Sequence, residues 1–228
     1  MKTRIKRMLI ILGGLYHGFD GFAGAMKSLF EARGGWSVET TFDLDVLTDL
    51  KTADFRMVLS YTCLSKNTAM QEASTPEKLT NEQVRGLADW VQNGGALLTV
   101  HCATVLGESG TELQRLFGGA FISHPAPFTF TVYPVGNAHP ITSGLAAFDV
   151  YDEFYIQQCE PSVEIHMFAT YNGANYPMVW SKLEGAGRVA HIAPGHFPEV
   201  WNLAPYQRLL IQAADWLTTA QLQTNDAS

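Results

Sequence analysis

Cysteine is scarce in this sequence and forms no metal-binding or disulfide pattern. The 228 residues include three cysteines, Cys63, Cys102 and Cys159, and no two of them have C-x-x-C spacing. Such an odd and sparse set predicts neither a disulfide framework nor a cysteine-rich zinc site. We therefore expect reduced thiols and a cytoplasmic location.

Positive charge is also in short supply. The formal net charge is -7, and the one cluster of basic residues runs from Lys2 to Arg7. Binding to a nucleic acid requires lysine and arginine side chains spread along a surface, which this composition does not offer. We therefore expect no nucleic-acid partner.

Long apolar runs are absent as well. No segment approaches the roughly 20 apolar residues needed to cross a bilayer. The N-terminal sequence MKTRIKRMLIILGG resembles a signal peptide, but its apolar run stops at Leu12, which is short for a signal core. We interpret this run as a first β-strand and expect no membrane partner.

The sequence does contain an alternation of strand and helix patterns. Residues 7–14 and 96–101 are apolar runs typical of strands that are covered on both faces. Between them, residues 21–35 place apolar side chains at helical spacing, and Thr80 with Gln83 forms a capping box that starts another helix. Connections of this length favour right-handed crossovers. We therefore predict a doubly wound, mostly parallel α/β sheet.

The second half of the sequence has a different pattern. Residues 128–135 (FTFTVYPV) alternate between apolar and polar side chains, which predicts an antiparallel extension of the sheet. Residues 206–220 supply a closing amphipathic helix. We find neither an internal repeat nor a linker, and we expect a single domain over residues 1–220 with a flexible tail at 221–228.

Three histidines follow predicted strands at the same edge of the sheet. Ligands of open α/β sheets bind outside the carboxyl ends of the parallel strands, and His17, His101 and His196 stand at such ends. A single histidine is more often structural, but a trio from different strands is typical of a catalytic or metal site. His166 and His191 lie inside predicted strands, and we interpret them as structural.

The acidic candidates for the same site are Asp152 and Glu153. Adjacent side chains on a strand point to opposite faces, so we expect one of the two to face the site. There it could serve as a general base or orient a histidine, and the alternative is a solvated loop carboxylate. His124 and His139 each precede a proline, so each could either contribute to the pocket or stabilise a loop.

Seven short stretches of the sequence resemble one family in their order and spacing. They are GGALLTVHCAT, LFGGAFISHP, HPITSGL, YDEFY, PMVW, GRVAHIAPGH and AADWL. Together they resemble the ThuA-like (trehalose-utilisation) family, which is similar in fold to class I glutamine amidotransferases. The resemblance covers nearly the whole chain. It implies a flavodoxin-like, class I glutamine amidotransferase-like sheet and a role in carbohydrate metabolism.

The relation to amidotransferases implies a sharp turn, or elbow, that carries a nucleophilic cysteine. Here His101 holds the elbow position and Cys102 follows it, and a shift of one residue turns a side chain to the other side of the pleat. His196 and Glu199 are three residues apart, where the amidotransferase pattern has the pair two apart. The sequence therefore argues against glutamine amidotransferase activity.

The resemblance implies a small-molecule carbohydrate as the ligand, either trehalose or a related disaccharide or a keto sugar. Neutral sugars bind to hydrogen-bonding and aromatic groups. The enzyme would be a hydrolase, a lyase or an isomerase. Whether the protein forms a homo-oligomer is left open by the sequence. The candidate catalytic residues are His101, His17, His196 and Glu153, and the candidate substrate-binding residues are Tyr16, Cys102, His124, Tyr155 and Trp180, with Trp201 as a further aromatic residue.

Three descriptions of the site stay open at this point. His17, His101 and His196, with or without Glu153, could hold a divalent metal such as zinc. The same groups could instead act without metal as acid and base beside a carbonyl, and the lack of H-x-x-x-H or H-x-H spacing slightly favours this version. The third description is a non-catalytic sugar-binding or regulatory domain.

Overall fold

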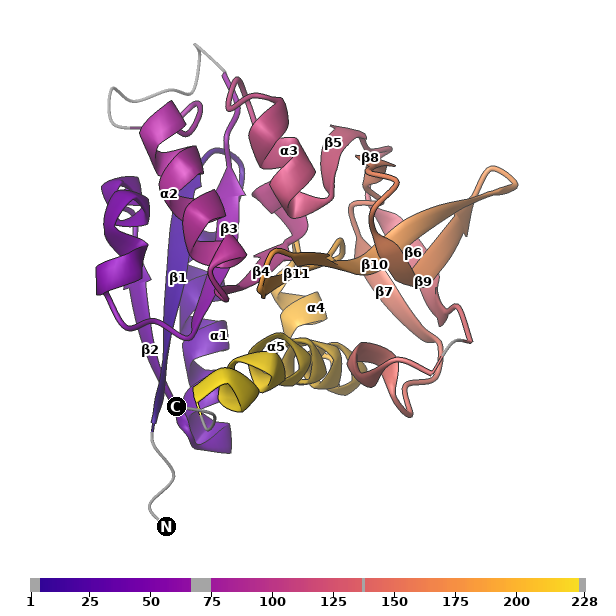
Figure 1. The fold of residues 1–228 in the computed structure, drawn as a ribbon. Coiled ribbons are helices and arrows are strands. Elements are labelled where there is room, and N and C mark those ends of the chain that lie inside the picture. The colour runs from indigo at the N-terminus through magenta and orange to yellow at the C-terminus, as the bar shows by residue number, and fades with distance from the viewer. Residues whose placement is uncertain (1–4, 67–74, 137, 226–228) are drawn as a thin grey trace.

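A large mixed β-sheet forms the centre of the fold (Figure 1). The structure is a computed structural model that describes residues 5–66, 75–136 and 138–225. The sheet has nine strands in the order β2-β1-β3-β4-β11-β10-β9-β6-β7, and a separate two-stranded sheet pairs β5 with β8. The α/β fold that the sequence predicts is therefore confirmed.

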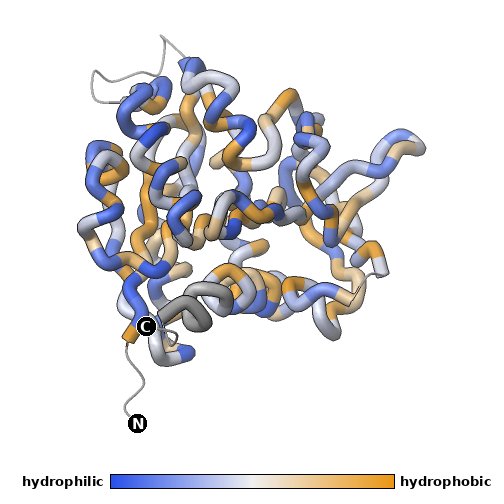
Figure 2. The backbone as a smooth tube through the Cα atoms, viewed as in Figure 1, coloured by the Kyte–Doolittle hydropathy of each residue, from blue (hydrophilic) through white to orange (hydrophobic). Residues whose placement is uncertain are grey.

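The first part of the sheet is parallel. It consists of β2 (Trp36–Thr41), β1 (Lys6–Gly14), β3 (Met57–Cys63), β4 (Ala96–Val100) and β11 (Gly187–Ile192). Every residue of β3 and β4 is buried. Strands β3 and β4 are mostly apolar because helices cover both of their faces. Figure 2 shows the hydrophobic stretches along these central strands.

The second part of the sheet is antiparallel, as residues 128–135 predict. It consists of β10 (Ala174–Glu184), β9 (Glu164–Tyr171), β6 (Phe128–Pro134) and β7 (Phe148–Asp152), and the small sheet pairs β5 (Gly119–Ser123) with β8 (Ile156–Cys159). Strand β7 ends at Asp152, so Glu153 is the first residue beyond the edge strand.

Helices pack on both faces of the sheet. They are α1 (Phe19–Arg33), α2 (Asn81–Gln92), α3 (Thr111–Phe117), α4 (Pro198–Trp201) and α5 (Ala204–Asn225), with the 3-10 segments η1 (Leu44–Thr52), η2 (His101–Thr104) and η3 (Pro140–Thr142). One apolar core joins α1 and α5 to the sheet, and a second joins η1, α2 and α3 to its other face. The two cores hold the strand ends in fixed relation to one another.

The helix boundaries follow from local chemistry. The predicted capping box at α2 is present, with the Gln83 N–H donating to the Thr80 hydroxyl at 3.2 Å and the Thr80 N–H donating to the Gln83 side chain at 2.8 Å. Helix α5 extends to Asn225, so residues 221–225 are helical where the sequence predicts a tail. Residues 226–228 lie outside the described part of the chain. Within the described residues, none of the helices has the length and apolar character that a membrane span requires.

Candidate functional site

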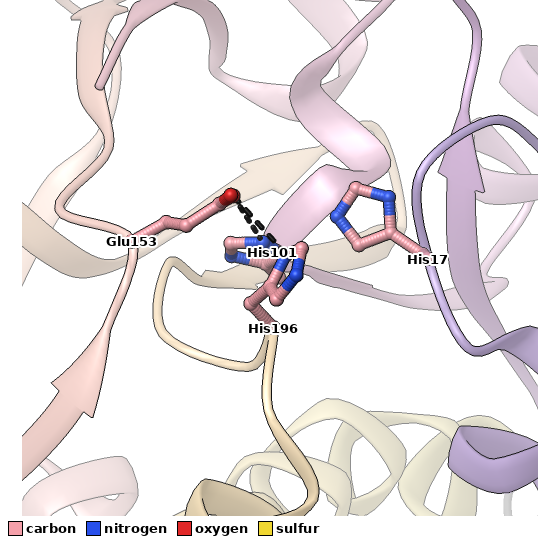
Figure 3. Close-up of side chains that lie close together, drawn as sticks. All are labelled: His17, His101, Glu153 and His196. Atoms are coloured by element: carbon pink, nitrogen blue, oxygen red, sulfur yellow. Dashed lines mark ion pairs between the residues drawn. The ribbon is translucent and has the colours of Figure 1, made fainter. Parts of the chain in front are cut away.

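Four of the predicted site residues meet at one edge of the sheet. His17 follows β1, His101 follows β4, His196 follows β11, and Glu153 follows β7. One ligand atom from each of these side chains lies within 4.8 Å of those of the other three (Figure 3). We call this set the histidine cluster. It assembles from four segments that are far apart in the sequence.

His101 occupies a sharp turn between β4 and η2. Its φ angle is 45°, a left-handed conformation that is uncommon for a residue with a side chain. Gly195 passes close by, since a Cβ at that position would lie 3.2 Å from the Cβ of His101 and 2.8 Å from the hydroxyl oxygen of Tyr206. The chain therefore turns sharply at His101, the position that the resemblance assigns to the elbow. Strained backbone of this kind is concentrated at functional sites.

Backbone carbonyls fix the protons of two of the rings. The Nδ1 atom of His17 lies 2.9 Å from the carbonyl oxygen of Leu15, and that of His101 lies 2.8 Å from the carbonyl oxygen of Ala193. A carbonyl can only accept, so each Nδ1 carries a hydrogen and the neutral ring presents a lone pair at Nε2. Both Nε2 atoms are buried and have no hydrogen-bond partner among the described residues. Metal-binding histidines are typically oriented in this way.

Glu153 faces ring nitrogens of two of the histidines. Its Oε2 atom lies 3.4 Å from Nε2 of His101 and 3.1 Å from Nδ1 of His196. Burial raises the pKa of Glu153, but His101 and His196 lower it by more, so the pKa lies well below its usual range and the carboxylate is ionised. Burial also lowers the pKa of His17 to about 3, which keeps that ring neutral.

This arrangement can accommodate a metal as well as the metal-free alternative that the sequence slightly favours. Oε2 of Glu153 lies close enough to Nε2 of His101 and to Nδ1 of His196 for either a proton or a cation to lie between the two atoms of each pair. Ligand atoms about 2.0–2.1 Å from a tetrahedral zinc are roughly 3.3–3.4 Å apart, close to the separations of Glu153 Oε2 from the two ring nitrogens. Three imidazoles and one carboxylate also form a donor set that zinc accepts.

Asp152 and Glu153 point in different directions at the end of β7, as the sequence predicts for adjacent residues. Asp152 is fully buried, and its carboxylate accepts the backbone N–H of Gly195 at 2.5 Å and that of His196 at 3.1 Å. Burial raises the pKa of Asp152, although these hydrogen bonds and His101 oppose the rise. Glu153 is therefore the residue that faces the histidines, and Asp152 holds the loop that carries His196.

Further buried donors hold the same loop. The Trp201 indole donates to the Gly195 carbonyl at 2.6 Å, and the Tyr61 hydroxyl donates to the same oxygen at 2.9 Å. The Tyr206 hydroxyl donates to the Pro194 carbonyl at 2.8 Å. The roles of Tyr61 and Tyr206 were not predicted from the sequence. In the sequence they are ordinary apolar positions of a strand and a helix, so no local signal distinguishes them.

Two of the predicted substrate-binding residues border the cluster. The Tyr155 ring packs against the His101 ring with 4.1 Å between ring centroids. His124 stacks on Tyr155 at 5.7 Å, and its Nε2 atom lies 3.7 Å from Oε1 of Glu153. Tyr16 is 49% exposed with a φ angle of 70°, next to His17 in the chain. These positions agree with contact to a ligand.

The assignment of Cys102 and Trp180 to substrate binding is wrong. Cys102 is fully buried within the apolar core, and burial raises the pKa of its thiol well above the usual value. Trp180 is fully buried too, where its indole donates to the Phe117 carbonyl at 3.0 Å and its ring packs on His191. Neither side chain belongs to the histidine cluster, and the contacts of both are with buried core residues, so both residues stabilise the fold.

The other histidines lie outside the cluster. His191 is buried and its Nδ1 lies 2.9 Å from the Thr99 hydroxyl, and the Nε2 of buried His166 lies 2.7 Å from the Ser181 hydroxyl. Both therefore have the structural position predicted for them. His139 stacks on His166 with ring centroids 3.9 Å apart, and it accepts the Ile141 N–H to cap η3. The sequence predicts either a pocket role or a loop-stabilising role for His139, and these contacts are those of the loop-stabilising role.

The fold and the site define an α/β protein with a histidine and carboxylate cluster at the sheet edge. The family described as trehalose utilisation, ThuA, matches residues 8–217. The chain therefore belongs to the ThuA family, which supports a role related to carbohydrates. No curated protein sequence matches the chain significantly.

Solved structures with the same fold include two ThuA-like proteins. One, from Parabacteroides merdae, has a TM-score of 0.78 and 18% identity, over 95% of this chain and 91% of that one. The other, from Bacteroides uniformis, has a TM-score of 0.75 and 18% identity, over 95% of this chain and 93% of that one. A β-galactosidase from Bacillus circulans has a TM-score of 0.62 and 10% identity, over 95% of this chain and 32% of that one. These identities establish similarity of fold alone.

Proposed function

We propose that this protein is an enzyme of carbohydrate metabolism that binds a divalent metal such as zinc in the histidine cluster. His17, His101, His196 and Glu153 would hold the ion. The observation that carries the proposal is the convergence of three buried ring nitrogens on one carboxylate, with no hydrogen-bond partner for Nε2 of His17 among the described residues. A buried ring nitrogen without a hydrogen bond has a desolvation cost, and a bound cation would offset that cost.

A bound ion would supply Lewis acidity, to polarise a sugar carbonyl or to activate water. The chain's own residues prepare the site for that chemistry. The Leu15 and Ala193 carbonyls keep the Nε2 lone pairs of His17 and His101 directed at the cluster. His124 is 34% exposed and its Nε2 atom lies 3.7 Å from Oε1 of Glu153, so it is the most exposed imidazole beside that carboxylate.

The other parts of the assignment have separate support. The buried thiol of Cys102 and the exposed position of Glu199 support the absence of glutamine amidotransferase activity. The order β2-β1-β3-β4-β11 supports a flavodoxin-like, class I glutamine amidotransferase-like parallel half. The ligand proposed is a small carbohydrate, and the ThuA family description supports it.

Metal content tests this proposal. The protein, purified without a histidine tag, should retain about one equivalent of zinc per chain after loading and dialysis, because three imidazoles and a carboxylate bind it. His101→Ala should lose the metal. His191→Gln is the matched control, since it removes a buried histidine that belongs to neither group of possible metal ligands. Wild-type protein that retains neither zinc, manganese nor cobalt would overturn the proposal.

A further inference from the structure

Residues 153–155 connect β7 to β8, and their side chains alternate in direction. Phe154 is fully buried in the apolar core, whereas Glu153 contacts His101 and Tyr155 packs on the same imidazole ring. Such alternation is typical of an extended segment. Phe154 therefore anchors the connection, and the residues on either side of it both reach the histidine cluster.

A hydrogen bond alone does not fix the plane of the His101 ring. Its Nδ1 atom lies 2.8 Å from the Ala193 carbonyl oxygen, but rotation about the Cβ–Cγ bond of a histidine has broad energy minima. The direction of the Nε2 lone pair therefore depends on what packs on the ring face. Tyr155 packs there, with 4.1 Å between the ring centroids and 32° between the ring planes.

The other rings near His101 do not pack on its face in this way. His17 and His196 approach edge-on, at centroid distances of 5.1 and 5.4 Å and interplanar angles of 64° and 80°. The Tyr61 ring lies at an angle of 30° but is 6.5 Å away. Among the described residues, Tyr155 therefore makes the shortest ring contact with His101.

The small sheet holds the Tyr155 ring in its place. Strand β5 pairs with β8, which begins directly after Tyr155 (Figure 1). Phe121 on β5 packs on Tyr155 at 4.5 Å between ring centroids, and His124, which follows β5, stacks on it at 5.7 Å. Tyr155 is only 2% exposed, so these contacts leave its ring little room to turn. The small sheet therefore supports the ring that packs on His101.

The tyrosine ring also favours a positively charged imidazole. The face of an aromatic ring carries negative charge density, which attracts a cation within about 6 Å of the centroid. An imidazole that gives its lone pair to a metal ion becomes more positive, and the His101 ring lies well within this distance of Tyr155. Tyr155 should therefore stabilise His101 more strongly when a metal is bound than when the ring is free.

We propose that Tyr155 is a positioning residue for His101, whose ring plane it sets and whose metal-bound form it favours. The inference rests on the proposed function and adds to it a residue that touches no metal. Because the effect comes from the face of the ring, a phenylalanine can replace the tyrosine and an aliphatic side chain cannot. The proposal also assigns a role to the small sheet, which holds this ring against the cluster.

Zinc affinity, measured by competition with a chelator, tests the inference. Tyr155→Leu should lower the affinity about tenfold, at the lower end of the loss that is typical when a ligand loses an orienting partner. Tyr155→Phe should keep the affinity of the wild-type protein. Tyr171→Leu is the matched control, since Tyr171 packs on Phe154 in the same core at 5.2 Å and belongs to neither group of possible metal ligands. It should lower stability in urea without changing zinc affinity.

Crystal structures of the metal-free variants test the same inference without zinc. In Tyr155→Leu the His101 ring should be rotated or occupy more than one orientation, whereas in Tyr155→Phe it should keep the contact with the Ala193 carbonyl. If Tyr155→Leu does not fold, Phe121→Leu takes its place, because it loosens the packing around Tyr155 and should lower zinc affinity about threefold.

The outcomes separate the two proposals. Wild-type protein that binds no zinc contradicts the proposed function, and the orientation of His101 in the metal-free crystals then decides the inference. A leucine variant that keeps both the zinc affinity and the His101 orientation of the wild-type protein overturns the inference alone. Equal losses of affinity in Tyr155→Leu and Tyr171→Leu would overturn it as well, because they would show a general effect of core packing.

Discussion

Asp152 accepts a hydrogen bond from the backbone N–H of His196 at 3.1 Å, while Nδ1 of the same histidine lies 3.1 Å from Oε2 of Glu153. Two consecutive carboxylates thus fix one imidazole, the first through its backbone and the second through its ring. The end of β7 therefore supplies both a proposed ligand and the residue that positions another.

Asp152→Asn should weaken zinc binding without removing any ligand. An asparagine side chain that keeps its oxygen at the Oδ2 position still accepts the Gly195 N–H, but its NH2 group replaces the Oδ1 that accepts the His196 N–H at 3.1 Å, which leaves that N–H only the 3.4 Å contact to the remaining oxygen. Loss of partners that orient ligands typically costs about 10–100-fold in metal affinity. Zinc titration of wild-type and variant protein measures the loss. Asp149→Asn, an exposed position on the same strand that accepts the Thr131 hydroxyl, should bind zinc normally; equal affinities for all three proteins would exclude the positioning role.

Gly195→Ala should destabilise the fold more than Gly136→Ala. Both glycines have a positive φ, 147° and 84°, so an alanine is strained at either position. A Cβ at Gly136 meets open space, whereas one at Gly195 would lie 2.8 Å from the Tyr206 hydroxyl and 3.2 Å from the His101 Cβ. Urea unfolding should show that Gly136→Ala lowers the free energy of unfolding by about 1 kcal/mol and that Gly195→Ala lowers it by at least twice as much. Similar losses of unfolding free energy for the two variants would mean that the loop carrying Gly195 can move away from His101.

Cys102 should be inert toward alkylation in the native protein. It is fully buried and burial holds its thiol pKa well above the usual value, so little thiolate forms. Cys159 is only partly buried, and burial raises its pKa to about 11. Mass spectrometry after brief iodoacetamide treatment should find Cys159 modified first. Rapid modification of Cys102, or ammonia release from glutamine that Cys102→Ala abolishes, would restore the nucleophile assignment that we reject.

His166 should make the protein less stable in acid. Burial, with the neighbouring His139, lowers the pKa of His166 from its ordinary value of 6.5 to about 4. Between these two values the unfolded chain binds a proton that the folded one does not, so stability is lost as pH falls from 6.5 towards 4. The slope for one proton is about 1.4 kcal/mol per pH unit. Urea unfolding at several pH values in this window should show a shallower slope for His166→Gln, and identical slopes would contradict the assignment.

The sequence predicts the fold better than it predicts the site because the fold depends on repeated local patterns. Apolar runs, a capping box and a switch to alternation at residues 128–135 each reveal an element on its own. The histidine trio was predictable for a similar reason, since strand ends in an open sheet converge at one edge.

The errors arose where the outcome depends on distant contacts. Trp180 and Cys102 are in sequence stretches that suggest a site, but the packing of other elements buries both of them. The preference for a metal-free site rests on the lack of ligand spacing within one element, and it stays a prediction. Here the four proposed ligands come from four elements, and no local spacing can indicate that.

Zinc-soaked crystals, measured at the zinc absorption edge, test the central claim most directly. We predict one strong anomalous peak within about 2.0–2.2 Å of ring nitrogens of His17, His101 and His196 and of a carboxylate oxygen of Glu153. An empty histidine cluster in crystals that carry zinc elsewhere, for example at His139, would contradict the account.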